Sequence, residues 1–396
     1  MNPIFQSFED KLYKGGLADK DIPLFGISDY TGKLSAPVLW NREKKESQIL
    51  EKIFEPLNIK ALLFSQPAEP YRTIINYLAE NSEGKITPQD CETRHFLHDL
   101  PVLSDFDADA LIQVLQSRKC VIFPGYGILT CSEYDIEKSY VTFSSVCFAC
   151  FVKFFSDFLY NAKRGNLTQK QINIFNQVVN FPEFSKCGIS GECKALLQQA
   201  PFESESDVLS AIEEAGRLTV EYRLVDSCFG NISYYHDDIL YISQTGSFLD
   251  NLNGHIVSCS LNEDLPCKGA SSELPAHRRI IKETGSKAIL HGHPMFSVIL
   301  SMDCDDDNCK NRGACHLKCS KERFACNIPV VPGEVGGGEY GLCNTVPDAI
   351  KERDGVIVLG HGVFTTGKKD FNEPFQHLLQ IEASCRREYF NRVEKA

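Results

Sequence analysis

The sequence has no block of lysine and arginine residues, and acidic residues outnumber basic ones by 53 to 41, which gives a formal net charge of −12. A chain with this charge and no basic cluster is not expected to bind nucleic acid. It also has no low-complexity tract, and 43% of its residues are hydrophobic. We therefore expect a folded chain with room for two or three domains, in which an anionic ligand would need a local pocket of hydrogen-bond donors.

Signals for export and for membrane insertion are also missing. The N-terminal stretch MNPIFQSFEDKLYKGG has no basic start followed by an apolar segment, so it does not have the pattern of a signal peptide. The most apolar stretch, residues 141–160, carries Lys153 and Asp157 and is predicted as a buried amphipathic helix. We predict no membrane partner and a cytoplasmic location. The 17 cysteines are then expected first as thiols or metal ligands, and only second as disulfides.

Two segments of the first half recur, in the same order, in the second half. VIFPGYGILTCSEYDI, from Val121, aligns without a gap on VIVLGHGVFTTGKKDF, from Val356. KKESQILEKIFEPLNIKALLFSQP, from Lys44, aligns likewise on SSELPAHRRIIKETGSKAILHGHP, from Ser271. Together the two matches predict a tandem duplication. Because strand-like and helix-like stretches alternate, we expect layered α/β domains at residues 1–165 and 205–396, joined by a linker at residues 166–204.

Three histidines of the second copy are absent from the first. His291 and His293 lie two apart on a predicted strand and so point to the same side, and His361 follows another apolar strand. The first copy has other residues at the three matching positions: Phe64, Gln66 and Tyr126. Their loss as a set indicates that the histidines act together, and three imidazoles are the ligand set of a catalytic zinc site with an open position. The alternative is three structural histidines with satisfied hydrogen bonds.

Polar residues around these histidines suggest further chemistry. Glu273 is a candidate general base, although a glutamate at the start of a helix is also favoured by the helix dipole. Three short segments offer hydroxyl, amide and backbone N–H donors, which can form an anion-binding nest or belong to ordinary turns. They comprise Gly230 and Asn231, Thr245 and Gly246, and Ser271 and Ser272.

These motifs occur in a recognisable order. They are GNIS from Gly230, QTG ending at Gly246, SSELPAH from Ser271, HGH from His291 and GHGVFTTG from Gly360. In that order they resemble the class II aldolase/adducin family, from about Ser206 to the C-terminus, whereas the first half resembles the family only over its framework. The resemblance implies tandem α/β/α domains, each with a central, largely antiparallel sheet. It also implies that the three histidines hold zinc or another divalent metal and that the six nest residues bind phosphate. Because the three histidines are absent from it, we interpret the first copy as degenerate.

The resemblance further implies a zinc-dependent aldolase, a lyase that cleaves or forms a phosphorylated ketose through a metal-stabilised enediolate. Glu273 would exchange the carbon-bound proton, and aldolases of the family carry glutamate there. The family also uses tyrosines, for which Tyr340 and Tyr389 are candidates. An epimerase, a dehydratase or a decarboxylase on the same scaffold is an alternative, and so is a non-catalytic, adducin-like interaction protein. Because family members are typically cyclic homotetramers, we expect a homo-oligomer, either a tetramer or a homodimer with pseudo-fourfold shape.

Residues 304–326 depart from the family pattern. Five cysteines crowd this insert: Cys304, Cys309, Cys315, Cys319 and Cys326. A structural zinc or an iron–sulfur cluster would explain the density of thiols, with disulfides and free thiols as the alternatives. The insert is therefore a candidate second metal site.

Overall fold

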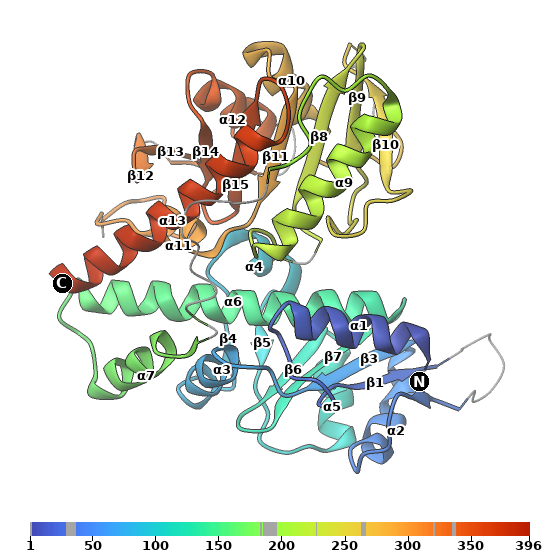
Figure 1. The fold of residues 1–396 in the computed structure, drawn as a ribbon. Helices are drawn as coiled ribbons and strands as arrows, with labels where there is room; N and C mark the ends of the chain where they lie inside the picture. Colours follow the sequence, from blue (N-terminus) through green and yellow to red (C-terminus); the bar gives the residue numbers. More distant parts are fainter. Residues whose placement is uncertain are drawn as a thin grey trace. The chain divides into compact units, whose positions relative to one another are not determined.

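The computed structural model describes residues 2–28, 37–182, 184, 196–226, 228–262, 267–306, 308–319, 321–334 and 338–396. The chain divides into two compact units (Figure 1). Unit 1 comprises residues 1–158 and 167–186, and unit 2 comprises residues 159–166 and 187–396. Helix α7, at Gln169–Val179, lies within the range predicted as a linker.

Unit 2 is built around an eight-stranded sheet of order β10-β9-β8-β11-β15-β14-β13-β12. The strands are β8 (Asn231–His236), β9 (Ile239–Ser243), β10 (Ile256–Ser260), β11 (Ala288–Gly292), β12 (Arg323–Ala325), β13 (Ile328–Val331), β14 (Gly355–Val358) and β15 (Gly362–Gly367). All neighbouring pairs are antiparallel except β13 and β14, which are parallel. The sheet of this unit is therefore largely antiparallel.

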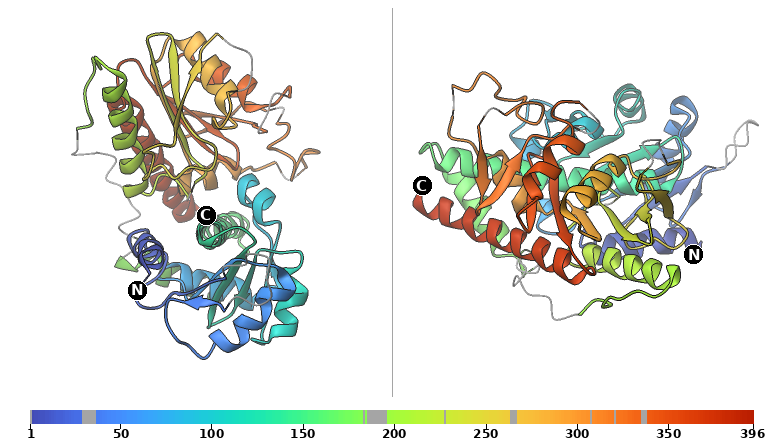
Figure 2. Two further views of the ribbon diagram at one scale, coloured as in Figure 1. Left: turned by 90° about the vertical axis from the view of Figure 1, so that its right-hand side faces the viewer. Right: turned by 90° about the horizontal axis from the view of Figure 1, so that it is seen from above.

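Helices cover both faces of this sheet (Figure 2). Helices α9 (Glu205–Glu221) and α13 (Asn372–Lys395) lie on one face, and α10 (Leu274–Thr284) and α12 (Leu342–Ile350) pack together on the other. Helix α11 (Met295–Met302) follows β11 and packs against α13. The architecture of unit 2 is an α/β/α sandwich.

The sequence explains the helix and strand that carry the site. Helix α10 begins at Leu274, has a proline in its first turn, where no intrahelical N–H is lost, and ends at Gly285. Gly285 has a φ of 66°, the left-handed conformation in which a helix commonly ends. Every residue of β11 is buried, because the strand lies between β8 and β15 with helices on both faces.

Unit 1 contains a smaller sheet of order β2-β1-β3-β7-β6, in which every neighbouring pair is antiparallel. Its strands are β1 (Leu24–Ile27), β2 (Leu39–Trp40), β3 (Ala61–Ser65), β6 (Cys120–Phe123) and β7 (Gly127–Ser132); β4 (Lys85–Ile86) and β5 (Leu100–Pro101) pair separately. The remaining elements are α1 (Pro3–Lys14), α2 (Ser47–Leu57), α3 (Tyr71–Glu80), α4 (Cys91–Leu97), α5 (Ala108–Leu115) and α6 (Ile136–Ala162). Helices α1 and α6 lie on one face of the five-stranded sheet, and α2 and α5 pack together on the other (Figures 1 and 2).

The elements of the two units coincide where the sequence repeats. Strand β3 and helix α2 have the same bounds as β11 and α10 after a shift of 227 residues, and β6 and β7 match β14 and β15 after a shift of 235. The order β1-β3-β7-β6 in one sheet corresponds to β8-β11-β15-β14 in the other. Strand register is conserved too: Ala61 pairs with Ser132 as Ala288 pairs with Gly367.

The prediction for the most apolar stretch is confirmed. It forms helix α6, which is long and apolar enough to cross a membrane by length and composition alone. However, 83% of the most apolar 18-residue window of this helix is buried inside the structure. Helix α6 therefore has the burial of a core helix.

Candidate metal centre

His291, His293 and His361 come from two neighbouring parts of the unit 2 sheet. His291 is the fourth residue of β11, His293 follows that strand before α11 begins, and His361 lies in the turn between β14 and β15. The next residue, Gly362, makes room for them. A Cβ atom at Gly362 would lie 2.8 Å from the ring of His291 and 2.8 Å from that of His293. A glycine is thus required for the turn to approach β11 this closely.

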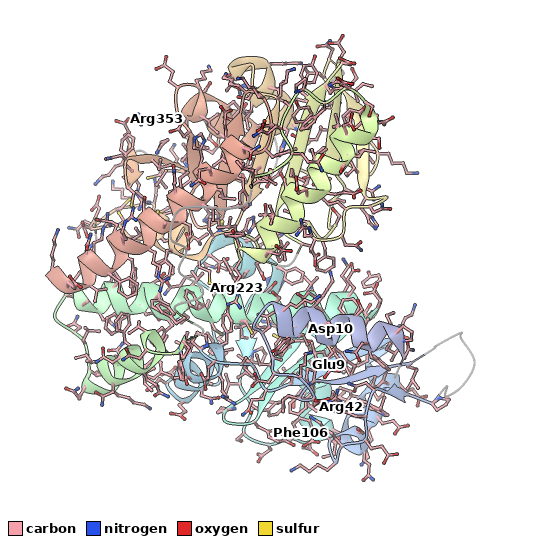
Figure 3. All side chains as sticks on the ribbon, in the orientation of Figure 1. Glu9, Asp10, Arg42, Phe106, Arg223 and Arg353 are labelled. Carbon is pink, nitrogen blue, oxygen red and sulfur yellow. A yellow bond between two sulfur atoms is a disulfide. The ribbon has the colours of Figure 1, made fainter. Side chains whose placement is uncertain are left out.

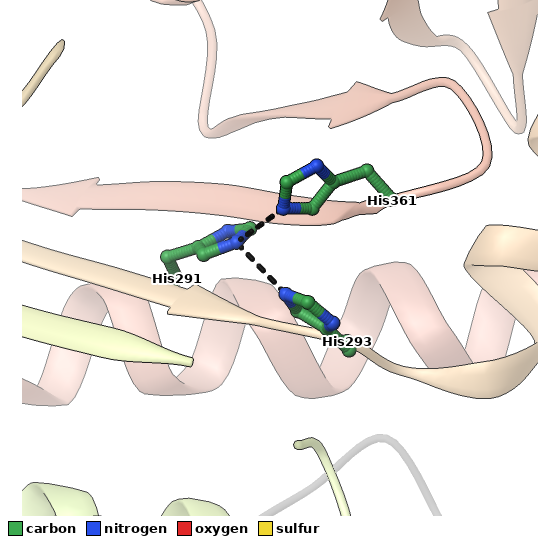
Figure 4. A group of neighbouring side chains, drawn as sticks. All are labelled: His291, His293 and His361. Atoms are coloured by element: carbon green, nitrogen blue, oxygen red, sulfur yellow. Dashed lines mark hydrogen bonds between the residues drawn. The ribbon is translucent and has the colours of Figure 1, made fainter. Parts of the chain in front are cut away.

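The three imidazoles converge on one point (Figure 4). Nε2 of His291 lies 3.0 Å from Nε2 of His293 and 3.3 Å from Nε2 of His361, and the three side chains are 0%, 2% and 3% exposed. Nδ1 of His291 lies 3.0 Å from the carbonyl oxygen of Val363, which can only accept a hydrogen bond. Nδ1 of His291 therefore carries the ring proton in the neutral form, and its Nε2 presents a lone pair to the centre of the triad.

The environment keeps His291 and His293 uncharged. Burial is the main cause that lowers the pKa of His291 to about 4, and it outweighs the opposing attraction of Glu273. Burial also lowers the pKa of His293 well below its usual range, with His291 and His361 adding to the effect. Neutral imidazoles are the form that binds metal. Three convergent imidazole nitrogens, two of them in neutral rings and both others within 3.3 Å of Nε2 of His291, fit a small divalent cation.

Glu273 lies directly against two of the three histidines. It is the residue before α10, and its carboxylate oxygens lie 3.4 Å from Nε2 of His361 and 3.7 Å from Nε2 of His291. Burial opposes ionisation of Glu273, but attraction to His291 and the contacts with His361 and Asn231 outweigh it and hold its pKa well below its usual range. An ionised carboxylate at this position places a negative charge beside the triad.

Comparison with known families agrees with this geometry. Residues 210–389 match the model of the class II aldolase and adducin N-terminal domain, a range that includes the triad and Glu273. This part of the chain is a class II aldolase and adducin domain. The match begins at residue 210 and leaves unit 1 outside it. No curated protein matches the sequence.

Solved structures similar to the chain include several aldolases. L-fuculose-1-phosphate aldolase from Thermus thermophilus is 22% identical over 48% of this chain and 95% of its own, with a TM-score of 0.40. A sugar-phosphate aldolase from Thermotoga maritima is 19% identical over 48% of this chain and 97% of its own, with a TM-score of 0.37. The N-terminal class II aldolase domain of a Thermoplasma acidophilum protein is 14% identical over 50% and 99%, with a TM-score of 0.34.

Two of the three predicted phosphate-binding pairs meet at one rim of unit 2. The backbone N–H of Ser271 donates to the carbonyl of Ser243 at 3.1 Å, and that of Thr245 donates to Gly269 at 3.0 Å. These bonds hold the turn after β9 beside the segment that enters α10. The exposed residues of the two pairs are Thr245, Gly246 and Ser272. The structure thus leaves donors open to a ligand there, and phosphate binding stays a prediction.

The third pair, Gly230 and Asn231, lies deeper. A Cβ atom at Gly230 would lie 2.8 Å from the carbonyl oxygen of His291, so glycine allows the chain to pass close to β11. Asn231 begins β8 and is buried, and its side-chain amide donates to Oε2 of Glu273 at 2.7 Å. At least one amide proton of Asn231 is therefore directed to the carboxylate rather than outward.

The two predicted tyrosines occupy different surroundings. Tyr340 is partly exposed, with Nζ of Lys318 5.7 Å from its ring centre. Tyr389 is fully buried against Phe296 and Phe390, and burial raises the pKa of its hydroxyl well above the usual value. A catalytic role for either tyrosine stays a prediction.

The cysteine insert does not form a comparable centre in the described part of the chain. There, the histidine triad is the only group of three or more His, Cys, Asp or Glu side chains that could share an ion. The five cysteines predicted as a second metal site are free thiols of intermediate exposure. A disulfide joins Cys259 and Cys267 instead, a pair that the sequence did not indicate. A second metal stays a prediction without support from the described side chains.

Sequence reasoning missed His277, which belongs to the site. Its Nε2 lies 2.6 Å from Oδ1 of Asn231, and its Nδ1 lies 2.7 Å from Oγ of Ser233. Burial lowers the pKa of His277 to about 3, so the ring is neutral. A signal was available, because His277 follows Glu273 by four residues, which places both on one face of a helix.

Two of the three matching positions of unit 1 are filled by aromatic rings, and the third by Gln66. Phe64, which corresponds to His291, packs against Phe106, Phe123 and Tyr126, and Figure 3 labels Phe106. Tyr126, which corresponds to His361, donates a hydrogen bond to Glu46, the counterpart of Glu273. The glutamate persists with a phenol as its partner, and no convergent set of metal-binding nitrogens is present at these positions.

Proposed function

We propose that the chain is a zinc-dependent aldolase that cleaves or forms a phosphorylated ketose. The contact between Glu273 and the histidine triad is the observation that carries this proposal, because it combines a cation site with an ionised base inside a class II aldolase and adducin domain. A divalent cation stabilises negative charge on a substrate carbonyl oxygen as a Lewis acid.

The spacing of the ligand atoms is compatible with zinc. Zinc–nitrogen bonds of about 2.0–2.1 Å in a tetrahedral site separate two nitrogens by roughly 3.3 Å. The two distances from Nε2 of His291 are 3.0 and 3.3 Å. With His291, His293 and His361 as its protein ligands, a bound zinc ion would keep a position for a substrate oxygen.

Different residues of this chain would transfer the proton and bind the substrate phosphate. In cleavage, a base removes the proton from the hydroxyl of the departing aldehyde carbon, the carbon–carbon bond breaks, and its electrons remain on the enediolate fragment. Glu273 would return a proton to the carbon of that fragment, or remove it in the condensation. The exposed rim of Thr245, Gly246 and Ser272 would bind the substrate phosphate.

A hydrogen-exchange experiment tests the proposal without knowledge of the aldehyde. We expect the zinc-loaded chain to exchange a carbon-bound hydrogen of dihydroxyacetone phosphate, or of another phosphorylated ketose in a panel, with D2O. Chelation should abolish the exchange. A chain that holds its metal but exchanges no member of the panel would contradict the proposal and favour the adducin-like, non-catalytic alternative.

We also propose that the two units arose by tandem duplication, with unit 1 as the degenerate copy. Matching element bounds, sheet order and strand register support it. On this basis the chain would assemble as a homodimer of pseudo-fourfold shape or as a tetramer. A cytoplasmic location fits the 13 free cysteines found beside one disulfide among the described residues.

A further inference from the structure

A chain of buried hydrogen bonds leads away from Glu273. It runs from Oε2 of Glu273 to the amide nitrogen of Asn231 at 2.7 Å, and from Oδ1 of Asn231 to Nε2 of His277 at 2.6 Å. It continues from Nδ1 of His277 to Oγ of Ser233 at 2.7 Å. All four side chains are buried, so water does not compete for these partners.

Only one arrangement of protons satisfies the chain. An ionised carboxylate can only accept, so the NH2 group of Asn231 faces Glu273 and its carbonyl oxygen faces His277. That oxygen can only accept in turn, so Nε2 of His277 carries the ring proton and Nδ1 accepts from the Ser233 hydroxyl. The imidazole therefore prevents the Asn231 amide from turning over, because the flipped amide would set NH2 against N–H.

Unit 1 shows that the fold does not require this polar chain. By strand pairing, Leu24 stands in unit 1 where Asn231 stands in unit 2, since Leu24 pairs with Phe64 as Asn231 pairs with His291. Likewise Gly26 pairs with Leu62 as Ser233 pairs with Ile289. The matching helices α2 and α10 place Leu50 at the position of His277. Both leucines are fully buried in one apolar cluster, so a leucine pair fills this space in the same framework.

We propose that His277 is a positioning residue for Glu273. Held by Ser233, it fixes the Asn231 amide, which donates to the carboxylate and keeps it against His291 and His361. The four polar groups occur together in unit 2, beside the triad, whereas unit 1, which lacks the triad, keeps only the glutamate. This inference rests on the proposed function, because that function gives Glu273 its role. The hydrogen bonds from which the inference is argued do not depend on the proposed function.

The leucine pair of unit 1 supplies the test variant. Asn231→Leu/His277→Leu replaces both polar groups at once, so neither Asn231 nor His277 is left without the other as its partner. The Ser233 hydroxyl loses its acceptor on His277. We expect wild-type zinc content and at least about a 10-fold loss in the rate of dihydroxyacetone phosphate exchange in D2O. In a Glu273→Gln background the same pair should cost no further rate, because His277 acts through that carboxylate. Wild-type exchange, or an additive loss in that background, would overturn the proposal.

Two further variants separate positioning from general destabilisation. His277→Gln keeps an N–H donor for Asn231 and should recover part of the rate that His277→Leu loses. Thr219→Val removes another fully buried hydroxyl, which donates to the carbonyl of Ala215 within α9, and should retain the wild-type rate. Equal losses in Thr219→Val and His277→Leu would assign the effect to stability and overturn the proposal.

A spectroscopic measurement separates this inference from the proposed function. The visible spectrum of the Co2+-loaded chain reports the charge and geometry around the ion without any substrate. We expect Asn231→Leu/His277→Leu to shift that spectrum in the same direction as Glu273→Gln. A wild-type spectrum in the double variant would overturn the positioning role. If the wild-type chain binds Co2+ but exchanges no carbon-bound hydrogen of any ketose, the proposed function is contradicted and the positioning role of His277 is not.

Discussion

At the scale of single residues, the sequence predicted some members of this site and missed others. His291, His293 and His361 were predicted as a set, because all three are missing from the first copy, and the structure brings their Nε2 atoms together. His277 was not predicted, because its role depends on Asn231, 46 residues away along the chain. Sequence spacing can place two side chains on one strand or helix face, but it cannot show a hydrogen bond between two distant elements.

The first prediction concerns Glu273. Glu273→Gln should leave the zinc content unchanged, since three histidines remain, and should lower the rate of dihydroxyacetone phosphate exchange by about 10²-fold or more, the usual scale for a general base. Glu283→Gln provides a matched control on α10, because that carboxylate pairs with Arg279 and Lys351. Metal analysis and NMR exchange measure both outcomes. Wild-type exchange in Glu273→Gln would remove the assigned role.

The second prediction concerns pH and the metal-free chain. The folded-state pKa values of His291 and His277 are lowered to about 4 and about 3, whereas an unfolded histidine titrates near 6.5. Between pH 6.5 and 4 the unfolded chain therefore binds more protons than the folded chain. The free energy of unfolding should fall as the pH is lowered through this window.

Denaturant titrations of the metal-free chain at several pH values check this prediction. His291→Phe, with the residue of unit 1, removes one titrating group and should show a shallower decline than wild type. A wild-type profile that is flat between pH 6.5 and 4 would contradict the burial of neutral histidines.

At the scale of elements, the repeated segments gave the most accurate predictions. Helix α10 and strands β11, β14 and β15 coincide with the sequence that recurs in unit 1, because the apolar pattern and the flanking glycines are repeated with it. The apolar helix α6 was also predicted correctly as buried. The Cys259–Cys267 disulfide was not indicated, since sequence alone does not pair cysteines.

The third prediction tests how the β14–β15 turn supports the site. Gly362→Ala would place a methyl group 2.8 Å from the rings of His291 and His293, so the turn must move away from β11. We expect this variant to lose most of its zinc as measured by metal analysis. Gly338→Ala is the control, because the nearest atom to a Cβ there is 3.9 Å away. Full zinc content in Gly362→Ala would show that the close approach is not needed.

At the scale of the whole molecule, the chain contains two sheets of related order, and among the described residues only one of them carries a histidine triad. Family resemblance predicted the largely antiparallel sheet of unit 2, and the strand pairings agree with it. The oligomeric state depends on surface complementarity between copies, which no motif in the sequence encodes. It therefore stays a prediction.

The fourth prediction concerns this assembly. If each chain fills two positions of a fourfold arrangement, the particle in solution should have twice the 44.4 kDa mass of one chain. Sedimentation equilibrium of the purified chain measures this mass directly, and a tetramer of chains would support the simpler homo-oligomer. A monomer at all concentrations would contradict both assemblies.

The metal content of the purified chain tests the central claim most directly, with His361→Tyr measured beside it. Tyrosine is the residue of unit 1 at this position, where Tyr126 fits beside Glu46 in the same framework, so the variant is expected to fold. The account predicts one tightly held divalent ion per wild-type chain and a large loss of that ion in His361→Tyr, because two imidazoles hold zinc far more weakly than three. A wild-type chain without metal, or a variant that retains the wild-type amount, would contradict it.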